Sequence, residues 1–371
     1  MPIQKRGLKA PGSSSAPSSP LPGKSGVKLI KPSGFQLQGS EVGEIMKQAN
    51  AAYGQDVARI AASLRRYEDR IRTGIFTLDL ALAGGFMTSR GAMLYGEKSS
   101  GKTTTAMLLC LNAQLKYPDL AVAWIDVEGT FDVTWFVKLG GDPDRLLLIE
   151  PETGEQAVDL AHAVLLSKEI SVVVTDSIAM LTPMKELDSS SEDQLPGLHA
   201  RLIGNYIRKT NNALLKERHR GHRPINLFIN QYRMKIGLVF GDPRTLPGGK
   251  ALEFATSTQV ETKNKEHISD KGDIQFNQHS FKITKEKTGA GRIREITFKL
   301  VRDPDYCDGL PEGTIDQMKS IIEFGTRVGL VEGRATFKKY GKFNSAADAM
   351  KHFLTDPEAY VNLQEDVINA H

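Results

Sequence analysis

The segment GEKSSGKT, residues 96–103, constrains the fold more than any other feature of this sequence. It satisfies the pattern GxxxxGK[ST], in which two glycines let the backbone curl until its N–H groups converge on phosphate oxygens. Such a loop follows a strand and precedes a helix, whose positive end lies beneath the phosphates. The apolar run 92–96 and the helical stretch 102–116 meet both requirements. The segment therefore predicts a phosphate-binding loop at the carboxyl end of a strand.

The side chains of this loop suit the phosphates of a nucleotide. Lys102 supplies a mobile positive charge for the β- and γ-phosphates, and the Thr103 hydroxyl completes the shell of a Mg²⁺ ion. ATP and Mg²⁺ are therefore the expected cofactors. The expected ATP-binding residues of the loop are Gly96, Glu97, Lys98, Ser99, Ser100, Gly101, Lys102, Thr103 and Thr104.

Two acids at the ends of other apolar runs complete the expected chemistry. Asp176 closes VVVTDS (172–177), where a second acid supports the magnesium shell, so Thr103 and Asp176 form the predicted metal site. Hydrolysis also needs a residue that orients or deprotonates water. Glu128, at the end of AVAWIDVE (121–128), is the preferred candidate, because ligands bind beyond the carboxyl ends of parallel strands. Asp126, two residues earlier, is the alternative.

The surrounding pattern predicts an α/β fold with a mostly parallel central sheet and helices on both faces. Short apolar runs alternate there with helical stretches of crossover length. The expected strands are 92–96, 121–128, 146–150, 172–177 and 226–231, and the expected helices are 102–116, 153–168 and 197–218. Three later runs, 256–263, 279–286 and 294–300, alternate more strictly and predict antiparallel strands that extend the sheet.

The two ends of the chain differ in composition from this core. Residues 1–34 hold six basic residues and no acid, and 11–26 has the composition of a disordered segment. Residues 40–69 are predicted to be helical, with Ser40 as the cap, and too short to bury their own apolar face. Residues 314–371 predict a small α/β or helical C-terminal domain. The expected division is a basic leader (1–34), a helical polymerisation segment (35–72), an ATPase core (73–305) and a C-terminal domain (306–371).

Composition excludes several other classes of protein. The two cysteines, Cys110 and Cys307, are too few for a disulfide framework or a cysteine-based zinc site. No apolar run approaches the length of a spanning helix, and the N-terminus lacks the apolar core of a signal peptide. A soluble cytoplasmic protein is expected, or one in the host cytoplasm if a phage encodes it.

Several motifs, in their order along the chain, resemble the core of the RecA-family DNA recombinases. They are RTGIFTLDLALAGG, GEKSSGKTTT, WIDVEGTFD, VVVTDSIAMLTP, FINQYRMKIGLVFGDPRTLPGGKALEF and KITKEKTGAGR. The resemblance covers about residues 72–305, and a weaker similarity continues to about residue 365. The segment that begins FINQ is more specific than the phosphate loop, which many unrelated nucleoside triphosphatases share. The resemblance implies a strand-exchange protein, bacterial or phage-encoded, that polymerises on single-stranded DNA and pairs it with duplex DNA.

The resemblance also implies roles for residues around the nucleotide. Asp132 and Trp135 match positions that pack on or hydrogen-bond the adenine. Gln231 matches a polar sensor of the γ-phosphate, which links the nucleotide to a DNA-binding loop that begins at Tyr232. Lys285 and Lys287 match a pair that reaches ATP across the subunit interface. The implied catalytic set is therefore Lys102, Glu128, Gln231, Lys285 and Lys287.

Two segments, 184–197 and 232–249, resemble the DNA-binding loops of the family. Aromatic and basic side chains of this kind suit stacking on bases and contact with phosphates. The implied DNA-binding residues are Arg201, Arg208, Arg233, Lys235, Phe240, Arg244, Gly248 and Gly249. The first segment departs from the family, since it is acidic and carries Pro196 where an apolar wedge is common.

Two rival functions share parts of this pattern. A ring-forming, helicase-like motor would use the same phosphate loop but would usually add a separate partner-binding domain. A DNA-coating protein that binds nucleotide only structurally would not need the set Lys102, Thr103, Glu128 and Asp176. The expected partners are single-stranded DNA, double-stranded DNA and further copies of the chain, with no membrane.

Overall fold

The computed structural model describes residues 39–54, 57–58, 69–189, 197–234, 244–269, 271–288 and 293–371. Contacts within the chain divide it into two compact units, Met1–Ile60 and Ala61–His371.

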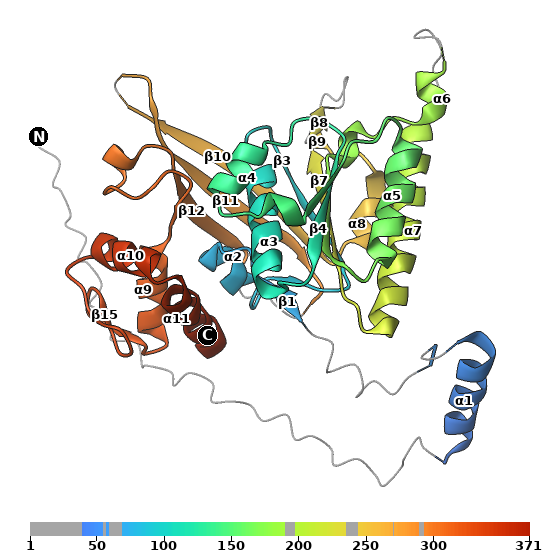
Figure 1. Ribbon diagram of the computed structural model, residues 1–371, viewed down its shortest axis with the longest axis horizontal. Coiled ribbons are helices and arrows are strands. Elements are labelled where there is room, and N and C mark those ends of the chain that lie inside the picture. The colour runs from blue at the N-terminus through green and yellow to red at the C-terminus, as the bar shows by residue number, and fades with distance from the viewer. Residues whose placement is uncertain are drawn as a thin grey trace, which may run out of the picture. The chain divides into compact units, whose positions relative to one another are not determined.

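The first unit contains the helix α1, Glu41–Tyr53 (Figure 1). The Ser40 side chain caps it by accepting a hydrogen bond from the Gly43 N–H at 3.2 Å, as the sequence predicted. The helix predicted over 40–69 is nevertheless too long. It ends before Gly54, whose φ of 110° favours a residue without a Cβ.

In the described part of the second unit, a nine-stranded sheet has the order β13-β12-β11-β10-β3-β7-β6-β4-β5 (Figure 1). Its strands are β3 (Gly91–Gly96), β4 (Ala121–Asp126), β5 (Leu146–Ile149), β6 (Ile170–Asp176), β7 (Ile225–Gln231), β10 (Thr258–Ile268), β11 (Ile274–Glu286), β12 (Glu295–Val301) and β13 (Ile315–Asp316). Strands from β10 to β5 pair in parallel, whereas β10 to β13 pair antiparallel.

The predicted parallel sheet with an antiparallel extension is confirmed, with two differences in strand length. Strand β4 ends at Asp126, so Glu128 lies in the turn that follows rather than on the strand. Strands β10 and β11 run further than predicted and form a long hairpin.

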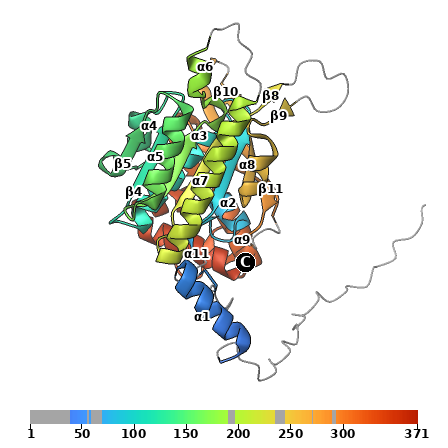
Figure 2. The same cartoon turned by 90° about the vertical axis from the view of Figure 1, so that its right-hand side faces the viewer.

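Helices cover both faces of the sheet, as predicted. They are α2 (Phe76–Ala81), α3 (Lys102–Lys116), α4 (Val133–Lys138), α5 (Gly154–Leu166), α6 (Met184–Leu187), α7 (Leu198–Arg220) and α8 (Gly249–Ala255). Short 3₁₀ turns lie at Pro143–Arg145, Ile178–Met180 and Pro304–Tyr306, and short strand pairs are β1 (Arg70–Ile71) with β2 (Phe86–Met87) and β8 (Arg233–Met234) with β9 (Arg244–Thr245). Figure 2 shows α5 and α7 side by side. Among the described residues, no helix is long and apolar enough to cross a membrane.

Alternate residues of one strand explain the two layers of core. In β4, Val122 and Trp124 join the cluster that contains Leu109 of α3, whereas Ala123 and Ile125 join the cluster that contains Tyr206 of α7. Successive side chains of a strand point to opposite faces, so an uninterrupted apolar run is buried on both.

The C-terminal residues form a third apolar cluster with α2. This part contains α9 (Met318–Arg327), β14 (Val331–Glu332), β15 (Thr336–Phe337), β16 (Gly341–Lys342), α10 (Ala346–Thr355) and α11 (Pro357–Ala370). Helices and a three-stranded sheet are thus both present among these residues. The domain boundaries at residues 34, 72 and 305 stay predictions.

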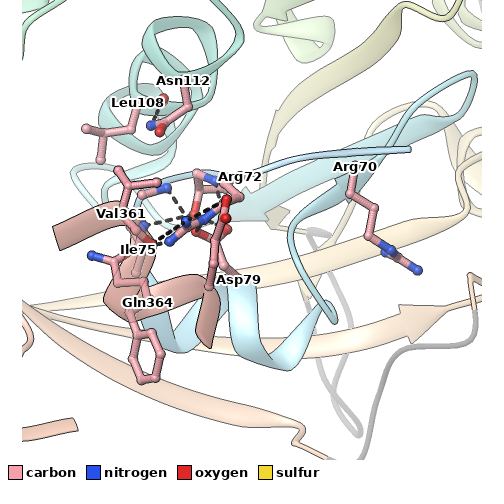
Figure 3. A network of polar contacts seen from close by, with 12 residues as sticks. Arg70, Arg72, Ile75, Asp79, Leu108, Asn112, Val361 and Gln364 are labelled. Carbon is pink, nitrogen blue, oxygen red and sulfur yellow. Dashed lines mark hydrogen bonds and ion pairs between the residues drawn. The ribbon is translucent and has the colours of Figure 1, made fainter. Parts of the chain in front are cut away.

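A polar network also joins the start of the core to α11 (Figure 3). The Arg72 guanidinium donates to the Gln364 side chain and lies 3.7 Å from the carboxylate of the fully buried Asp79. Asp79 accepts hydrogen bonds from the backbone N–H groups of Thr73 at 2.7 Å and Gly74 at 3.0 Å. Burial raises the pKa of Asp79, although Arg72 and these hydrogen bonds oppose the rise.

Candidate functional site

The phosphate loop connects β3 to α3, and its two glycines are held in conformations that other residues would strain. Gly96 has a φ of 157°, and a Cβ there would lie 2.2 Å from the Thr262 carbonyl oxygen. Gly101 has a φ of 85° and precedes the first residue of α3, Lys102. A Cβ on Gly101 would lie 2.7 Å from the ring of His279. The motif glycines therefore permit close packing of the loop on β10 and β11.

Hydrogen bonds hold the loop against the neighbouring strand β10. The Ser100 hydroxyl lies 2.6 Å from the Thr262 hydroxyl and donates to the Glu97 carbonyl at 2.8 Å. The Lys102 ammonium donates to the same Glu97 carbonyl at 2.5 Å. Burial lowers the pKa of Lys102, while the carboxylate of Asp176 opposes the shift. These hydrogen bonds therefore hold the loop around a buried cation, the Lys102 ammonium.

A cavity of about 270 Å³ opens beside this loop. One side consists of loop and helix residues, and the other of residues from the antiparallel extension. Its lining is Ser99, Ser100, Gly101, Lys102, Thr103, Thr104, Glu266, Ile274, Asn277, His279, Leu300 and Arg302. The last six residues were not predicted, because only the pairing of β10, β11 and β12 brings them to the loop.

The predicted metal-binding pair is in contact. The Thr103 hydroxyl donates to the Asp176 carboxylate at 2.8 Å. Burial raises the pKa of Asp176 to about 7, with the nearby carboxylates of Glu128 and Asp126 adding to the rise. A hydroxyl and a crowded carboxylate are hard oxygen donors of the kind that Mg²⁺ prefers.

The two candidate acids for water activation have different surroundings. The carboxylate oxygens of Asp126 accept the N–H groups of Gly129 at 2.9 Å and Phe131 at 2.8 Å, so Asp126 holds the turn after β4. Glu128 instead accepts hydrogen bonds from two side chains, Ser177 at 2.5 Å and Gln231 at 2.7 Å. This arrangement favours Glu128 over Asp126.

Gln231 lies where three parts of the site meet. It is the last residue of β7 and pairs in register with Gly96 at the start of the phosphate loop. Its side-chain amide donates to Glu128. The next residue, Tyr232, begins the second of the predicted DNA-binding segments, and its N–H donates to the Gly96 carbonyl at 3.4 Å. A displacement of Gln231 would therefore affect the positions of both the phosphate loop and this DNA-binding segment.

Of the two residues expected at the adenine, Trp135 lies on α4 and Asp132 is its N-cap. Asp132 caps this helix by accepting the Trp135 N–H at 2.9 Å. The Trp135 ring faces the guanidinium of Arg302, with 5.0 Å between the Arg302 Cζ atom and the ring centroid. Among the described residues, the lining of the phosphate-loop cavity includes Arg302 but neither Asp132 nor Trp135.

The predicted pair of lysines lies away from the phosphate loop of its own chain. Lys285 pairs with Gln259 of β10, which pairs with Met93, three residues before Gly96. Its ammonium donates to backbone carbonyls of α8, and it lines a separate cavity of about 620 Å³. Lys287 lies one residue beyond β11. At about 3.3 Å per strand residue, Lys285 lies roughly 10 Å before Gly96 along the strand direction, and its strand is two strands away from β3 across the sheet.

The second predicted DNA-binding segment, 232–249, is described only at its ends. Strands β8 and β9 pair there and place Arg233 opposite Thr245 and Arg244 opposite Met234. The Arg233 guanidinium donates to the Ala179 carbonyl at 2.6 Å. Gly248 and Gly249 end the segment, with φ values of 89° and 54° at the start of α8. Lys235 and Phe240 lie outside the described residues.

The first predicted segment, 184–197, begins with the one-turn helix α6, and 190–196, including Pro196, lies outside the described residues. Gly197 begins α7 with a φ of 83°. Arg201 and Arg208 are exposed on this helix and line a cavity of about 420 Å³ together with Lys185. The two arginines, seven residues apart on α7, thus share one surface.

Comparison with known proteins assigns the family. The family model described as "RecA N-terminal domain" matches residues 40–307. A Protein RecA from a Wolbachia strain of Brugia malayi is 37% identical over 273 residues, which cover 73% of this chain and 72% of that protein. The Protein RecA of Bacillus licheniformis is 31% identical over 331 residues, covering 88% of this chain and 90% of that protein. The chain belongs to the RecA family.

Membership of the RecA family makes this chain a DNA-dependent ATPase of homologous recombination. The match also agrees with the geometry, because the matched range 40–307 contains β3, the phosphate loop, β6 and β7.

Proposed function

We propose that this RecA-family protein forms a helical filament on single-stranded DNA and pairs that strand with homologous duplex DNA at the expense of ATP. The observation that carries the proposal is the position of Gln231. It hydrogen-bonds Glu128 at 2.7 Å, lies beside Gly96, and precedes the segment proposed to bind DNA. Such a filament would act in the cytoplasm of a bacterium or of a phage host.

ATP is proposed to bind with its phosphates on the loop Gly96–Thr104, which supplies backbone N–H groups and the charge of Lys102. Thr103 and Asp176 would hold a Mg²⁺ ion, which neutralises charge that develops on the phosphate oxygens. Lys102 would exchange its present acceptor, the Glu97 carbonyl, for phosphate oxygens. Asp132 and Trp135 are proposed to lie on the adenine side.

Glu128 is proposed to orient the attacking water and to accept its proton. Its carboxylate is fixed by Ser177 and Gln231, so the direction of the carboxylate depends on the position of Gln231. A γ-phosphate that attracted the Gln231 amide would shift that hydrogen bond and, through Tyr232, the neighbouring segment. Nucleotide state and DNA binding would thereby be coupled through one side chain.

Lys285 and Lys287 are proposed to complete the site of a neighbouring protomer. Within one chain Lys285 lies level with Met93 of β3, three residues before the phosphate loop begins, and two strands away from it. Two cations there would approach a γ-phosphate only when a second protomer presents it. Hydrolysis would therefore depend on assembly of the filament.

The proposed DNA contacts are Arg201, Arg208, Arg233, Lys235, Arg244, Phe240, Gly248 and Gly249. The described members lie on α7 and at the ends of the second segment. Several phosphate contacts per protomer would make the affinity for single-stranded DNA fall with salt, with a log–log slope of about −0.7 per contact. Watson–Crick pairing, rather than the protein, would then read the sequence.

The test is ATP hydrolysis with and without single-stranded DNA at two salt concentrations, for the wild type and Lys102→Ala. We expect strong stimulation by DNA, less at the higher salt, and its loss in the variant. Activity that is indifferent to DNA would contradict the proposal. Electron microscopy of the same samples separates open filaments, which we expect, from the closed rings of a helicase-like motor.

A further inference from the structure

Arg70, the first residue of β1, bonds to two other segments of the chain. Its Nη1 atom donates hydrogen bonds to the Leu82 carbonyl at 2.8 Å and the Gly85 carbonyl at 3.1 Å, in the turn between α2 and β2. Its Nη2 atom donates to the Thr288 carbonyl at 2.7 Å, and both nitrogens lie 3.2 Å from the Thr288 hydroxyl. Figure 3 shows the Arg70 side chain apart from the polar network that joins the core to α11. Arg70 therefore links the turn before β2 to the segment that follows β11.

The turn that holds Arg70 is a closely packed part of the core. Leu82 is fully buried in the cluster that contains Leu109. Gly85 has a φ of 113°, and a Cβ there would lie 2.2 Å from the Ile71 carbonyl oxygen, so the turn packs tightly on β1. A guanidinium presents its donors in a rigid plane, so two bonds to this turn fix its position. The segment on the other side of Arg70 is thereby attached to the core.

Thr288 directly follows Lys287, one of the two lysines proposed to act on the nucleotide of a neighbouring protomer. The Glu286 carboxylate accepts the Thr288 N–H at 2.5 Å and also accepts the Thr288 hydroxyl. The second oxygen of Glu286 accepts the Thr258 hydroxyl at 3.0 Å, at the start of β10. The Thr288 hydroxyl thus donates to Glu286 and accepts from Arg70. Both neighbours of Lys287 in the sequence are therefore held in place.

The backbone of Lys287 is fixed, whereas its side chain is not. Its N–H donates to the Ser257 carbonyl at 3.0 Å. Lys287 is exposed, and its ammonium makes no hydrogen bond or ion pair with the residues that the structure describes. Burial lowers the pKa of Lys285, and the charge of Lys287 adds to this, so the two charges act on each other. The place that the Lys287 ammonium can reach therefore depends on where its backbone is held.

We propose that Arg70 is a positioning residue for ATP hydrolysis, which holds the backbone at Thr288 and so keeps Lys287 within reach of phosphates bound by a neighbouring protomer. The inference rests on the proposed function of Lys285 and Lys287. Arg70 itself contacts no nucleotide. Without Arg70, the segment would keep its bonds to β10 and β11 but lose its attachment to the core turn. The rate of hydrolysis would then fall, while binding of ATP to the chain's own phosphate loop would not.

The rate of DNA-stimulated ATP hydrolysis tests this inference. It is measured on the full-length protein at saturating ATP and saturating oligo(dT). The variants are Arg70→Ala, Thr288→Val, Lys287→Ala and the double variant Arg70→Ala with Lys287→Ala. Calorimetric binding of a non-hydrolysable ATP analogue without DNA, and the midpoint of urea unfolding, are recorded for each variant.

Arg72→Ala is the matched control. It removes a guanidinium from the same stretch of chain, one that donates to Gln364 and Val361 and not to Thr288. The Arg72 guanidinium also lies 3.7 Å from the buried Asp79 carboxylate, so its loss should lower the urea midpoint at least as much as Arg70→Ala does. The rate of hydrolysis by Arg72→Ala should nevertheless stay within about twofold of the wild type.

We expect Arg70→Ala to lower the rate about tenfold, because misplacing a group by about 1 Å has effects of up to about 100-fold. Thr288→Val removes only the hydroxyl, so it should lower the rate about threefold and leave the urea midpoint close to that of the wild type. Both variants should bind the ATP analogue within about twofold of the wild-type affinity. A wild-type rate in Arg70→Ala would overturn the inference. Should Arg70→Ala not fold, a wild-type rate in Thr288→Val would overturn it equally.

The double variant separates positioning of Lys287 from a general structural role. Lys287→Ala should lower the rate about 100-fold and keep a residual rate, since Lys285 still supplies one charge. In that background Arg70→Ala should add less than about twofold, because Arg70 acts through Lys287. A further loss of about tenfold there, or the same loss in Arg72→Ala as in Arg70→Ala, would make Arg70 a structural residue and overturn the inference. A wild-type rate in Lys287→Ala would instead overturn the proposed function of that lysine, and this inference with it.

Discussion

His279 lies beneath the phosphate loop and should make the stability of this protein depend on pH. It is 2% exposed, its ring stacks on Phe298 with 5.0 Å between centroids, and it contacts Gly101. Within the described part of the chain, neither ring nitrogen makes a hydrogen bond of acceptable geometry. Burial lowers the pKa of His279 to about 4, and the nearby Ser100 backbone opposes this only in part.

The size of the effect follows from the two pKa values. The unfolded imidazole binds a proton near pH 6.5, whereas the folded protein keeps His279 neutral to about pH 4. The contribution of His279 to the free energy of unfolding is therefore complete above about pH 6.5 and is lost as the pH falls toward 4. Linkage gives a loss of about 1 kcal/mol at pH 6 and about 2 kcal/mol at pH 5.

The assay is urea unfolding of the wild type and His279→Asn at three values, about pH 7.5, 6 and 5. The difference in unfolding free energy between the two proteins removes the contribution of carboxylates, which both share. We expect this difference to shrink by about 2 kcal/mol between pH 7.5 and pH 5. Phe337→Leu, in the C-terminal cluster, should lower stability while keeping the pH dependence of the wild type. A difference between wild type and His279→Asn that does not vary with pH would refute the reasoning.

Three further predictions concern the catalytic site and the network beside α2. Glu128→Gln should lower the rate of ATP hydrolysis at least about 100-fold while nucleotide affinity changes little; an unchanged rate would remove Glu128 as the base. Lys285→Ala with Lys287→Ala should abolish DNA-stimulated hydrolysis but leave calorimetric binding of an ATP analogue intact, and loss of that binding would place the lysines in their own chain's site. Asp79→Ala should lower the free energy of unfolding by about 3 kcal/mol or more, since it leaves buried N–H donors without an acceptor; a loss below 1 kcal/mol in urea unfolding would contradict this.

The fold was largely predictable because a parallel strand that is buried on both faces appears in the sequence as a run of consecutive apolar residues. The runs that became β3 and β6 are mostly apolar, whereas β7 contains Asn226 and Asn230, and each of the three strands was placed within two residues. The length of the N-terminal helix was not predictable from its apolar pattern. Gly54 ends α1 in the middle of the predicted range. Its backbone conformation is not helical, and the apolar periodicity of the sequence does not reveal this.

The site was predictable only where its residues are close in sequence or at strand ends. Thr103 and Asp176 meet at 2.8 Å because the carboxyl ends of β3 and β6 lie at one edge of the sheet. The sequence preferred Glu128 to Asp126 only by its position, and the turn after β4 adds that two backbone N–H groups occupy the Asp126 carboxylate. Nothing in the spacing of these two acids reveals that turn.

The sequence alone determined the phosphate loop, the parallel sheet around it and the expectation of a RecA-type recombinase. These depend on local order: glycine spacing, apolar periodicity and the residue that follows each strand. The tertiary structure alone decided which distant residues surround the loop. Thr262, His279 and Arg302 reach it through the pairing of β10, β11 and β12. Strand pairing is determined by burial and backbone hydrogen bonding between residues more than 150 positions apart, as between Gly96 of β3 and Thr262 of β10, and no local sequence pattern predicts it.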